Sequence, residues 1–207
     1  EWTFIHPRNA GPDTDFDWQY VDPIMTFAKE HQMRLRCHGL FLPAMPGAAG
    51  NWDYPEWLTH LSPNLMQAMM RHHIDTIFEH FAQAPFADVK KEWTVVNEAI
   101  IDDPSGTLIT YDRALSNADL KGTIWKKAIR HADDIIETDG GEMGIEFLKY
   151  VFIAARLKDP TVQLFYNDYF CEDSMNLNVI RNKARRVKWL ANYLLSLGDY
   201  EGRPLLD

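Results

Sequence analysis

The chain has 207 residues, of which 46% are hydrophobic and 25% charged, and 30 acidic against 21 basic residues give a formal net charge of −9. This composition is typical of one globular domain with a sizeable core, and the length is too short for two ordinary domains. The negative charge repels phosphate backbones and no apolar run is long enough for a membrane span, so neither nucleic acid nor membrane is an expected partner.

Strand-like apolar runs alternate with helical patterns along the chain. In chain order, the predicted elements are a helix over 21–31, a strand over 33–38 ending at Gly39, a helix over 63–82, a strand over 93–98, helices over 122–136 and 143–157, a strand over 162–168 and a helix over 176–197. The helix over 63–82 has Ser62 as a predicted N-cap and Pro63 at its first position. Its Met and aromatic residues recur at helical spacing and are predicted to be core.

Two of these helices have a further predicted face. The first helix has four apolar residues on one side, namely Val21, Ile24, Phe27 and Ala28. The helix over 176–197 sets an apolar stripe against a basic face that we expect to be solvated, made of Arg181, Lys183, Arg185 and Lys188.

Alternating strands and helices predict a parallel sheet with helices outside it. A closed barrel buries both faces of such a sheet, and a complete (β/α)8 barrel takes about 250 residues. Three strand–helix units and the tail of an earlier one occupy the sequence. We therefore predict an α/β fold of the (β/α)8 TIM-barrel type, with residues 1–207 forming a single, incomplete domain.

Polar clusters follow the three predicted strands at residues 37–39, 97–99 and 167–169, with the sequences CHG, NEA and NDY. Active sites of such barrels form at the C-terminal ends of the strands, so three clusters in register indicate a site. The two cysteines, Cys37 and Cys171, are too few for a disulfide framework and are predicted to be free thiols.

The segment at residues 93–99, WTVVNEA, resembles the WDVVNEA segment of glycoside hydrolase family 10, the endo-β-1,4-xylanase family. Residues 36–40, RCHGL, resemble the family's RGHTL segment at the end of the third strand, and residues 166–169, YNDY, match its NDYN segment. Glu1-Trp2 resembles the remnant of the family's NEMKW segment. These matches follow the family's order and cover nearly the whole chain, and they imply that it runs from about the end of strand 2 to helix 5 of the barrel.

The resemblance implies a retaining glycoside hydrolase that cleaves internal β-1,4 bonds of xylan or a related plant-type polysaccharide. Glu98 would be the general acid/base, and Asn97, His38, Asn167 and Tyr169 would contact the sugar. This chemistry needs one carboxylic acid to protonate the leaving oxygen and a second carboxylate about 5–5.5 Å away to attack the anomeric carbon. No cofactor is implied, and no metal site is expected, because His72-His73 has no partner at ligand spacing.

Each assigned residue also has a plainer interpretation. Glu98 alone would be a surface residue and Asn97 a turn residue, and His38 fits a core histidine about equally well. Asn167 suits a helix cap, and Tyr169 suits either a sugar platform or the barrel rim. Asp168, next to them, is expected to be structural.

Two positions depart from the family pattern. Thr3 replaces the family's Lys in NEMKW, and Leu42 replaces a Trp after the strand-three His. Both family residues line sugar sites on the non-reducing side of the cut, so we expect weak binding there unless the loop at residues 43–54 compensates.

The family's nucleophile Glu ends the seventh strand, whereas this sequence stops at what resembles the approach to strand six. The nucleophile is therefore expected outside the 207 residues, the isolated chain is expected to be inactive, and the rest of the barrel is an expected partner. The resemblance also implies a secreted, extracellular or periplasmic protein. Two alternatives stay open: a non-catalytic carbohydrate-binding barrel, and a cellulase or β-glucanase of a related barrel family.

Overall fold

The computed structural model describes residues 15–42, 56–101, 115, 120, 143–169, 171 and 178–207. Its elements are α2 (Asp22–Glu30), β1 (Leu35–Phe41), the 3-10 helix η2 (Glu56–His60), α3 (Pro63–Ala82), β2 (Lys91–Asn97), α5 (Met143–Lys158), β3 (Gln163–Asn167), α6 (Asn178–Ser196), β4 (Asp199–Tyr200) and β5 (Arg203–Pro204). Four predicted helices and all three predicted strands are confirmed. The predicted helix over 122–136, the loop at 43–54 and Thr3 lie outside the described residues.

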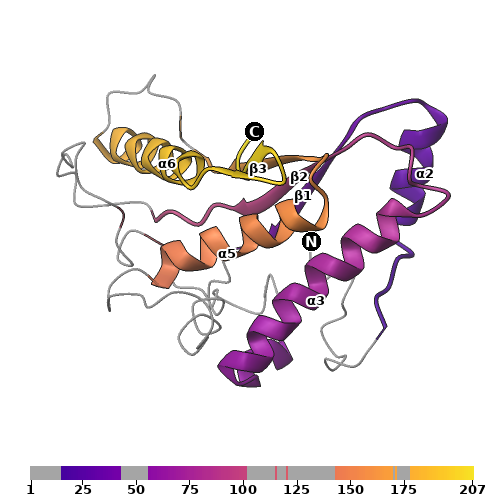
Figure 1. Ribbon diagram of the computed structural model, residues 1–207, viewed down its shortest axis with the longest axis horizontal. Coiled ribbons are helices and arrows are strands. Elements are labelled where there is room, and N and C mark those ends of the chain that lie inside the picture. Colours follow the sequence, from indigo (N-terminus) through magenta and orange to yellow (C-terminus); the bar gives the residue numbers. More distant parts are fainter. Residues whose placement is uncertain are drawn as a thin grey trace.

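The three long strands form one parallel sheet in the order β1-β2-β3, and β4 and β5 pair antiparallel in a separate hairpin. Figure 1 shows α3 and α5 beside each other along one side of this sheet, with α2 at one end and α6 at the other. The predicted parallel strands in chain order, with helices outside, are confirmed. This is the alternation of a (β/α)8 barrel, of which the chain forms part.

β1 extends two residues beyond the predicted end at Gly39, which corrects our boundary. Gly39 has a φ of 75°, and a Cβ added there would lie 3.1 Å from Leu42 Cδ1, so the position favours glycine. The pairing with β2 shifts between His38 and Phe41, which means that β1 bulges around Gly39 and then continues.

A second shift in register, between Thr94 and Val96, decides which side chains face the helices. Phe41, Val96 and Tyr166 form one row across the sheet. The Phe41 ring contacts His73 of α3 and Phe147 of α5, with centroids 5.8 and 5.9 Å apart, so this row faces the helices. The next row along the strands therefore faces the other side of the sheet.

The core lies between the sheet and the helices. Trp93 of β2 stacks on Phe78 of α3 with ring centroids 5.0 Å apart. The predicted apolar stripe of α3 is buried there, including Met66, Met70, Ile74, Ile77, Phe78 and Phe81. Ser62 caps α3 as predicted, because its hydroxyl accepts a hydrogen bond from the Leu65 amide at 3.4 Å.

The predicted apolar face of α2 is partly wrong. Met25 and Ala28 are buried, whereas Ile24 and Phe27 are 54% and 55% exposed. Residues three apart lie on the same side of a helix, so a core contact through Met25 and Ala28 turns Phe27 outward. Ile24 lines the edge of a pocket between β1, α2 and α3 and stays half exposed. An apolar residue at helical spacing does not by itself indicate which of two adjacent stripes is buried.

A buried arginine joins α5 to the end of the chain. The Arg156 guanidinium is fully buried, donates to the Pro204 and Val162 carbonyls at 2.8 and 2.6 Å, and pairs with the Asp207 carboxylate at 2.6 Å. Burial opposes ionisation of Asp207, but the hydrogen bond from the Leu164 amide and the pairing with Arg156 outweigh it and lower the pKa of Asp207 below its ordinary value.

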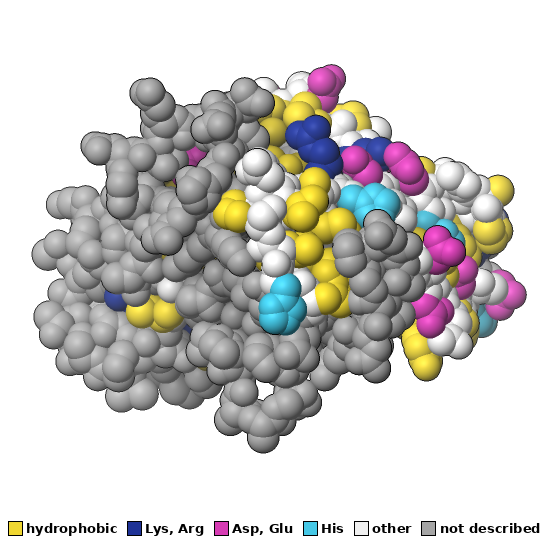
Figure 2. Space-filling model, turned by 90° about the horizontal axis from the view of Figure 1, so that it is seen from below, with side chains coloured by type: hydrophobic (Ala, Val, Ile, Leu, Met, Phe, Trp, Pro, Cys, Tyr) yellow, Lys and Arg dark blue, Asp and Glu magenta, His cyan; other side chains and the backbone are white. Residues whose placement is uncertain are grey.

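Acidic, basic, histidine and apolar side chains are interspersed over the described part of the helix layer when it is seen from below (Figure 2). Two ion pairs join α5 to α3, because the Lys158 ammonium of α5 lies 3.4 Å from the Asp75 carboxylate and 2.5 Å from the Glu79 carboxylate of α3. Among the described helices, none combines the length and the apolar character needed to cross a membrane.

Candidate active site

Asn97 and Asn167 meet at the C-terminal ends of β2 and β3. They are register partners, and the Asn167 side-chain amide donates to the Asn97 side-chain carbonyl at 2.6 Å. Their row follows the one that faces the helices, so both side chains lie on the opposite face of the sheet, which is the interior side of a barrel. Asn97 is buried and Asn167 is exposed.

Glu98 directly follows this pair in a backbone conformation that is unusual for its residue type. Its φ is 51°, in the left-handed region, and its amide donates to the Asn167 carbonyl at 2.7 Å. Such a conformation costs about 1–2 kcal/mol for a residue with a Cβ and persists only where the surroundings hold it. Glu98 is half-buried and follows Val95 and Val96, which are buried in the predicted strand.

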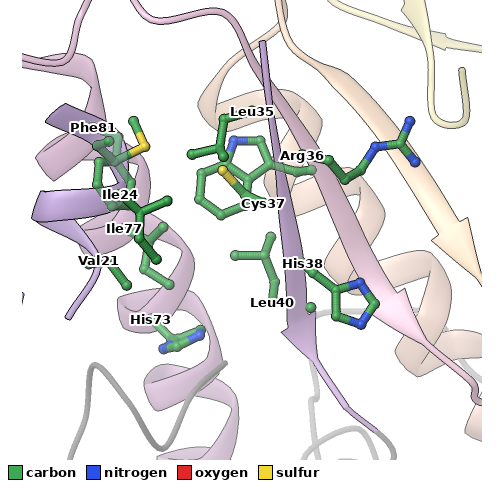
Figure 3. Close-up of a pocket in the computed structure, with 13 residues that line it drawn as sticks. Val21, Ile24, Leu35, Arg36, Cys37, His38, Leu40, His73, Ile77 and Phe81 are labelled. Atoms are coloured by element: carbon green, nitrogen blue, oxygen red, sulfur yellow. The ribbon is translucent and has the colours of Figure 1, made fainter. Parts of the chain in front are cut away.

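His38 lies on the same face of the sheet but lower in the barrel. Figure 3 shows Arg36 and His38 projecting from one side of β1, while Leu35 and Cys37 point toward α2 and α3. The His38 side chain is exposed in this part of the barrel. Its register partner is Thr94 of β2. Thr94 lies three positions before Asn97, so His38 lies about 10 Å below the Asn97–Asn167 pair along the strands.

A charged layer lies below His38 on the same face. The Glu92 carboxylate is buried and pairs with the Arg34 guanidinium at 2.5 Å and the Arg36 guanidinium at 2.9 Å. The hydrogen bond from Arg34, followed by that from Arg36, holds the pKa of Glu92 below its ordinary value. Arg36 also stacks over the Phe165 ring, 3.6 Å from its centroid. Both oxygens of the Glu92 carboxylate are bound by guanidinium groups, and Glu92 lies six positions before Glu98, about 20 Å along the strand. This is too far for a second catalytic carboxylate, which must lie about 5–5.5 Å from the acid.

Tyr169 and Asp168 follow β3 and both contact a lysine of α6. The Lys183 ammonium lies 2.9 Å from the Asp168 carboxylate and 3.1 Å from the centroid of the Tyr169 ring. The side chains of Lys183 and Asp168 are 1% and 0% exposed, so this is a buried ion pair, in keeping with the structural role expected of Asp168. One face of the Tyr169 ring is thus occupied by a cation.

The solvated basic face that we predicted for α6 is wrong at Lys183. The local pattern places Lys183 among basic residues, but α6 turns it inward to neutralise Asp168, 15 positions earlier in the chain.

Tyr166 was also missed as a site residue, because a tyrosine in a β-branched and aromatic run is already explained by strand formation. No local signal in the sequence marks either residue.

The described residues also enclose a mostly apolar pocket of about 180 Å³ between β1 and the helices α2 and α3 (Figure 3). Its lining includes Met25, Cys37, Ile77, Phe81 and Trp93. It lies mainly on the helix side of the sheet, opposite the face that carries Asn97 and Asn167. We therefore place the candidate active site at the strand ends and not in this pocket.

Two further expectations concern metals and thiols. No group of three or more His, Cys, Asp or Glu side chains that could hold a metal ion occurs in the described ranges. Cys37 and Cys171 are free thiols, as predicted. Burial raises the pKa of Cys37 to about 12, so it is an inert thiol.

A comparison with protein families matches residues 2–193 to the model of glycosyl hydrolase family 10. The curated relatives include a β-1,4-xylanase of Dictyoglomus thermophilum, 26% identical over 190 residues that cover 91% of this chain and 41% of that protein. The endo-1,4-β-xylanase A of Xylanibacter ruminicola is 26% identical over 189 residues, which cover 88% and 38% of the two chains. The chain thus spans about 40% of the length of these relatives.

Solved structures with the same fold include a xylanase of Paenibacillus barcinonensis complexed with a conduramine derivative, with a TM-score of 0.60, 23% identity and coverage of 93% of this chain and 46% of that one. An intracellular xylanase of Thermoanaerobacterium saccharolyticum in complex with xylotriose has a TM-score of 0.61 and 24% identity, and the match covers 91% and 50% of the two chains. These likenesses confirm the fold as part of a (β/α)8 barrel.

Proposed function

The chain belongs to glycosyl hydrolase family 10, and from this membership we propose that it contributes the acid/base half of the active site of a retaining endo-β-1,4-xylanase. The single observation that supports this most is the position of Glu98 after the paired Asn97 and Asn167, at the C-terminal end of a barrel strand. Catalytic residues of (β/α)8 barrels come from these strand ends.

Glu98 is proposed to protonate the leaving sugar oxygen and then to activate the water that hydrolyses the glycosyl-enzyme. The Asn97–Asn167 pair supports this role because it presents neutral donors and acceptors to sugar hydroxyls beside the acid. His38 and Tyr169 are proposed as further sugar contacts, His38 deeper on the interior face and Tyr169 in the segment that follows Asn167 at the end of β3.

The second carboxylate is proposed to lie outside these 207 residues. In the described part of the interior face, Glu92 is paired with two arginines and is unsuited to attack a sugar. Residues 1–207 are proposed to form one barrel domain together with the chain that supplies this carboxylate.

The active protein is expected outside the cell or in the periplasm, although one structural neighbour is described as an intracellular xylanase.

The experiment is hydrolysis of matched xylo- and cello-oligosaccharides by a protein that contains this chain together with the second carboxylate. We expect cleavage of internal bonds in the xylose chains, with the newly formed anomeric centre retaining its β configuration in NMR spectra recorded during the reaction. Preferred cleavage of the glucose chains would favour a cellulase or β-glucanase. Tight binding of both without cleavage would favour a carbohydrate-binding barrel and refute the proposal.

A further inference from the structure

The segment that follows β2 is held by three consecutive backbone amides. The Glu98 amide donates to the Asn167 carbonyl at 2.7 Å, and the amides of Ala99 and Ile100 both donate to the Tyr166 hydroxyl oxygen at 2.9 and 3.2 Å. The two acceptor atoms belong to the last two residues of β3. The backbone that carries Glu98 is therefore fixed from one side by the neighbouring strand.

Only one set of hydrogen bonds is possible for the Tyr166 hydroxyl. A phenolic oxygen has two lone pairs and one proton. The two amides occupy the lone pairs, so the proton must be donated elsewhere, and it goes to the Asp168 carboxylate at 2.5 Å. Every hydrogen-bonding position of this hydroxyl is filled.

The Asp168 carboxylate, which accepts this hydrogen bond, is itself held in place. The other oxygen of the Asp168 carboxylate accepts from the Lys183 ammonium and from the Tyr169 amide, both at 2.9 Å. Burial, and then the negative charge of Asp168, raise the pKa of Tyr166 well above its ordinary value, so the hydroxyl keeps the proton that it donates. A chain of contacts thus runs from α6 through Lys183, Asp168 and Tyr166 to the amides after Glu98.

From these contacts we infer that Tyr166 is a positioning residue for Glu98, and that Asp168 and Lys183 hold Tyr166 in place from behind the sheet. The inference rests on the proposed function of Glu98 as acid/base. The left-handed backbone at Glu98 needs an external constraint, and the two hydrogen bonds to one rigid ring supply it on the C-terminal side of that residue. Tyr166 lies on the helix-facing side of the sheet and is not proposed to touch the substrate.

The test is Tyr166→Phe, which removes only the hydroxyl, with Tyr150→Phe as the control because Tyr150 is a buried tyrosine that lies in α5 and not in β3. Both variants are made in the protein that also contains the second carboxylate. The measurement is kcat/KM for a series of aryl xylosides whose leaving groups differ in acidity. In Tyr166→Phe, we expect about a tenfold to hundredfold loss for poor leaving groups, because the acid is misplaced.

For leaving groups that need no proton, the expected loss in Tyr166→Phe is less than about threefold. A merely structural role would lower kcat/KM equally across the series, and that result would overturn the inference. Tyr150→Phe is expected to leave the dependence on leaving group unchanged.

A second measurement does not depend on activity. In a crystal structure of Tyr166→Phe we expect Glu98 to leave the left-handed region or its carboxyl group to shift, and in solution we expect faster hydrogen exchange at the amides of Ala99 and Ile100. An unchanged backbone with unchanged exchange would overturn the inference even if the wild type proved inactive. An inactive wild type with the expected backbone change would refute the proposed function alone.

Discussion

The left-handed conformation of Glu98 predicts an inverted order of stability for two small substitutions. Glu98→Ala and Glu98→Gly both remove the carboxylate, and both keep the amide that donates to the Asn167 carbonyl. They differ in the cost of a φ near 51°, which is about 1–2 kcal/mol for a residue with a Cβ and absent for glycine. The greater entropy of glycine in the unfolded chain offsets about 0.5–1 kcal/mol of this.

Glu98→Gly is therefore expected to be more stable than Glu98→Ala by about 1 kcal/mol, which corresponds to roughly 2–4 °C in melting temperature for a domain of this size. Ala68 provides the control, because it lies exposed in α3, where Ala68→Gly should instead destabilise by about 1 kcal/mol. Urea unfolding of the variants measures both differences. Equal stabilities, or a more stable Glu98→Ala, would refute the left-handed conformation and with it the need for a positioning residue.

Two further predictions concern the pKa shifts. Asp207→Asn should lower the free energy of unfolding at pH 7 by about 3 kcal/mol, because the buried Arg156 loses its counter-charge. Because the folded-state pKa of Asp207 is lowered, the difference in unfolding free energy between the wild type and Asp207→Asn should be complete above about pH 4. It should disappear as the pH falls through the lowered pKa of Asp207. A difference that stays constant in urea unfolding experiments from pH 7 to pH 3 would contradict this. Cys37 is half-buried, and its pKa of about 12 should make it react with iodoacetamide at pH 8 roughly a thousandfold more slowly than an unhindered thiol, as followed by peptide mass mapping. Alkylation at the ordinary rate would contradict the raised pKa.

The strands, their parallel order and most helix bounds could be predicted from the sequence because they depend on local patterns. Alternating apolar runs specify β1, β2 and β3, and Ser62 with Pro63 specifies the start of α3. Glu98 was identified as the candidate acid by a different route, from the resemblance of residues 93–99 to the family's WDVVNEA segment.

The support around Glu98 could not be predicted, because it depends on contacts between distant positions. The burial of Lys183 is decided by the rotation of α6 about its own axis, which the neutralisation of Asp168 fixes. The side of the sheet that Asn97 faces depends on a shift in register at Thr94, and the sequence shows no glycine or proline there to mark it. The stripe of α2 that is buried was likewise ambiguous, since both candidate stripes are apolar.

The measurement that tests the central claim most directly is the leaving-group dependence of Glu98→Gln in a protein that contains both carboxylates. Gln keeps the size of Glu but cannot donate a proton, so cleavage of unactivated xylosides should fall by about 10²–10⁴-fold while formation of the glycosyl-enzyme from an activated aryl xyloside persists. Added azide should then restore turnover of the activated substrate, because it attacks the glycosyl-enzyme without a general base. An equal loss for both substrates with no rescue by azide would contradict the assignment of Glu98 as the acid/base.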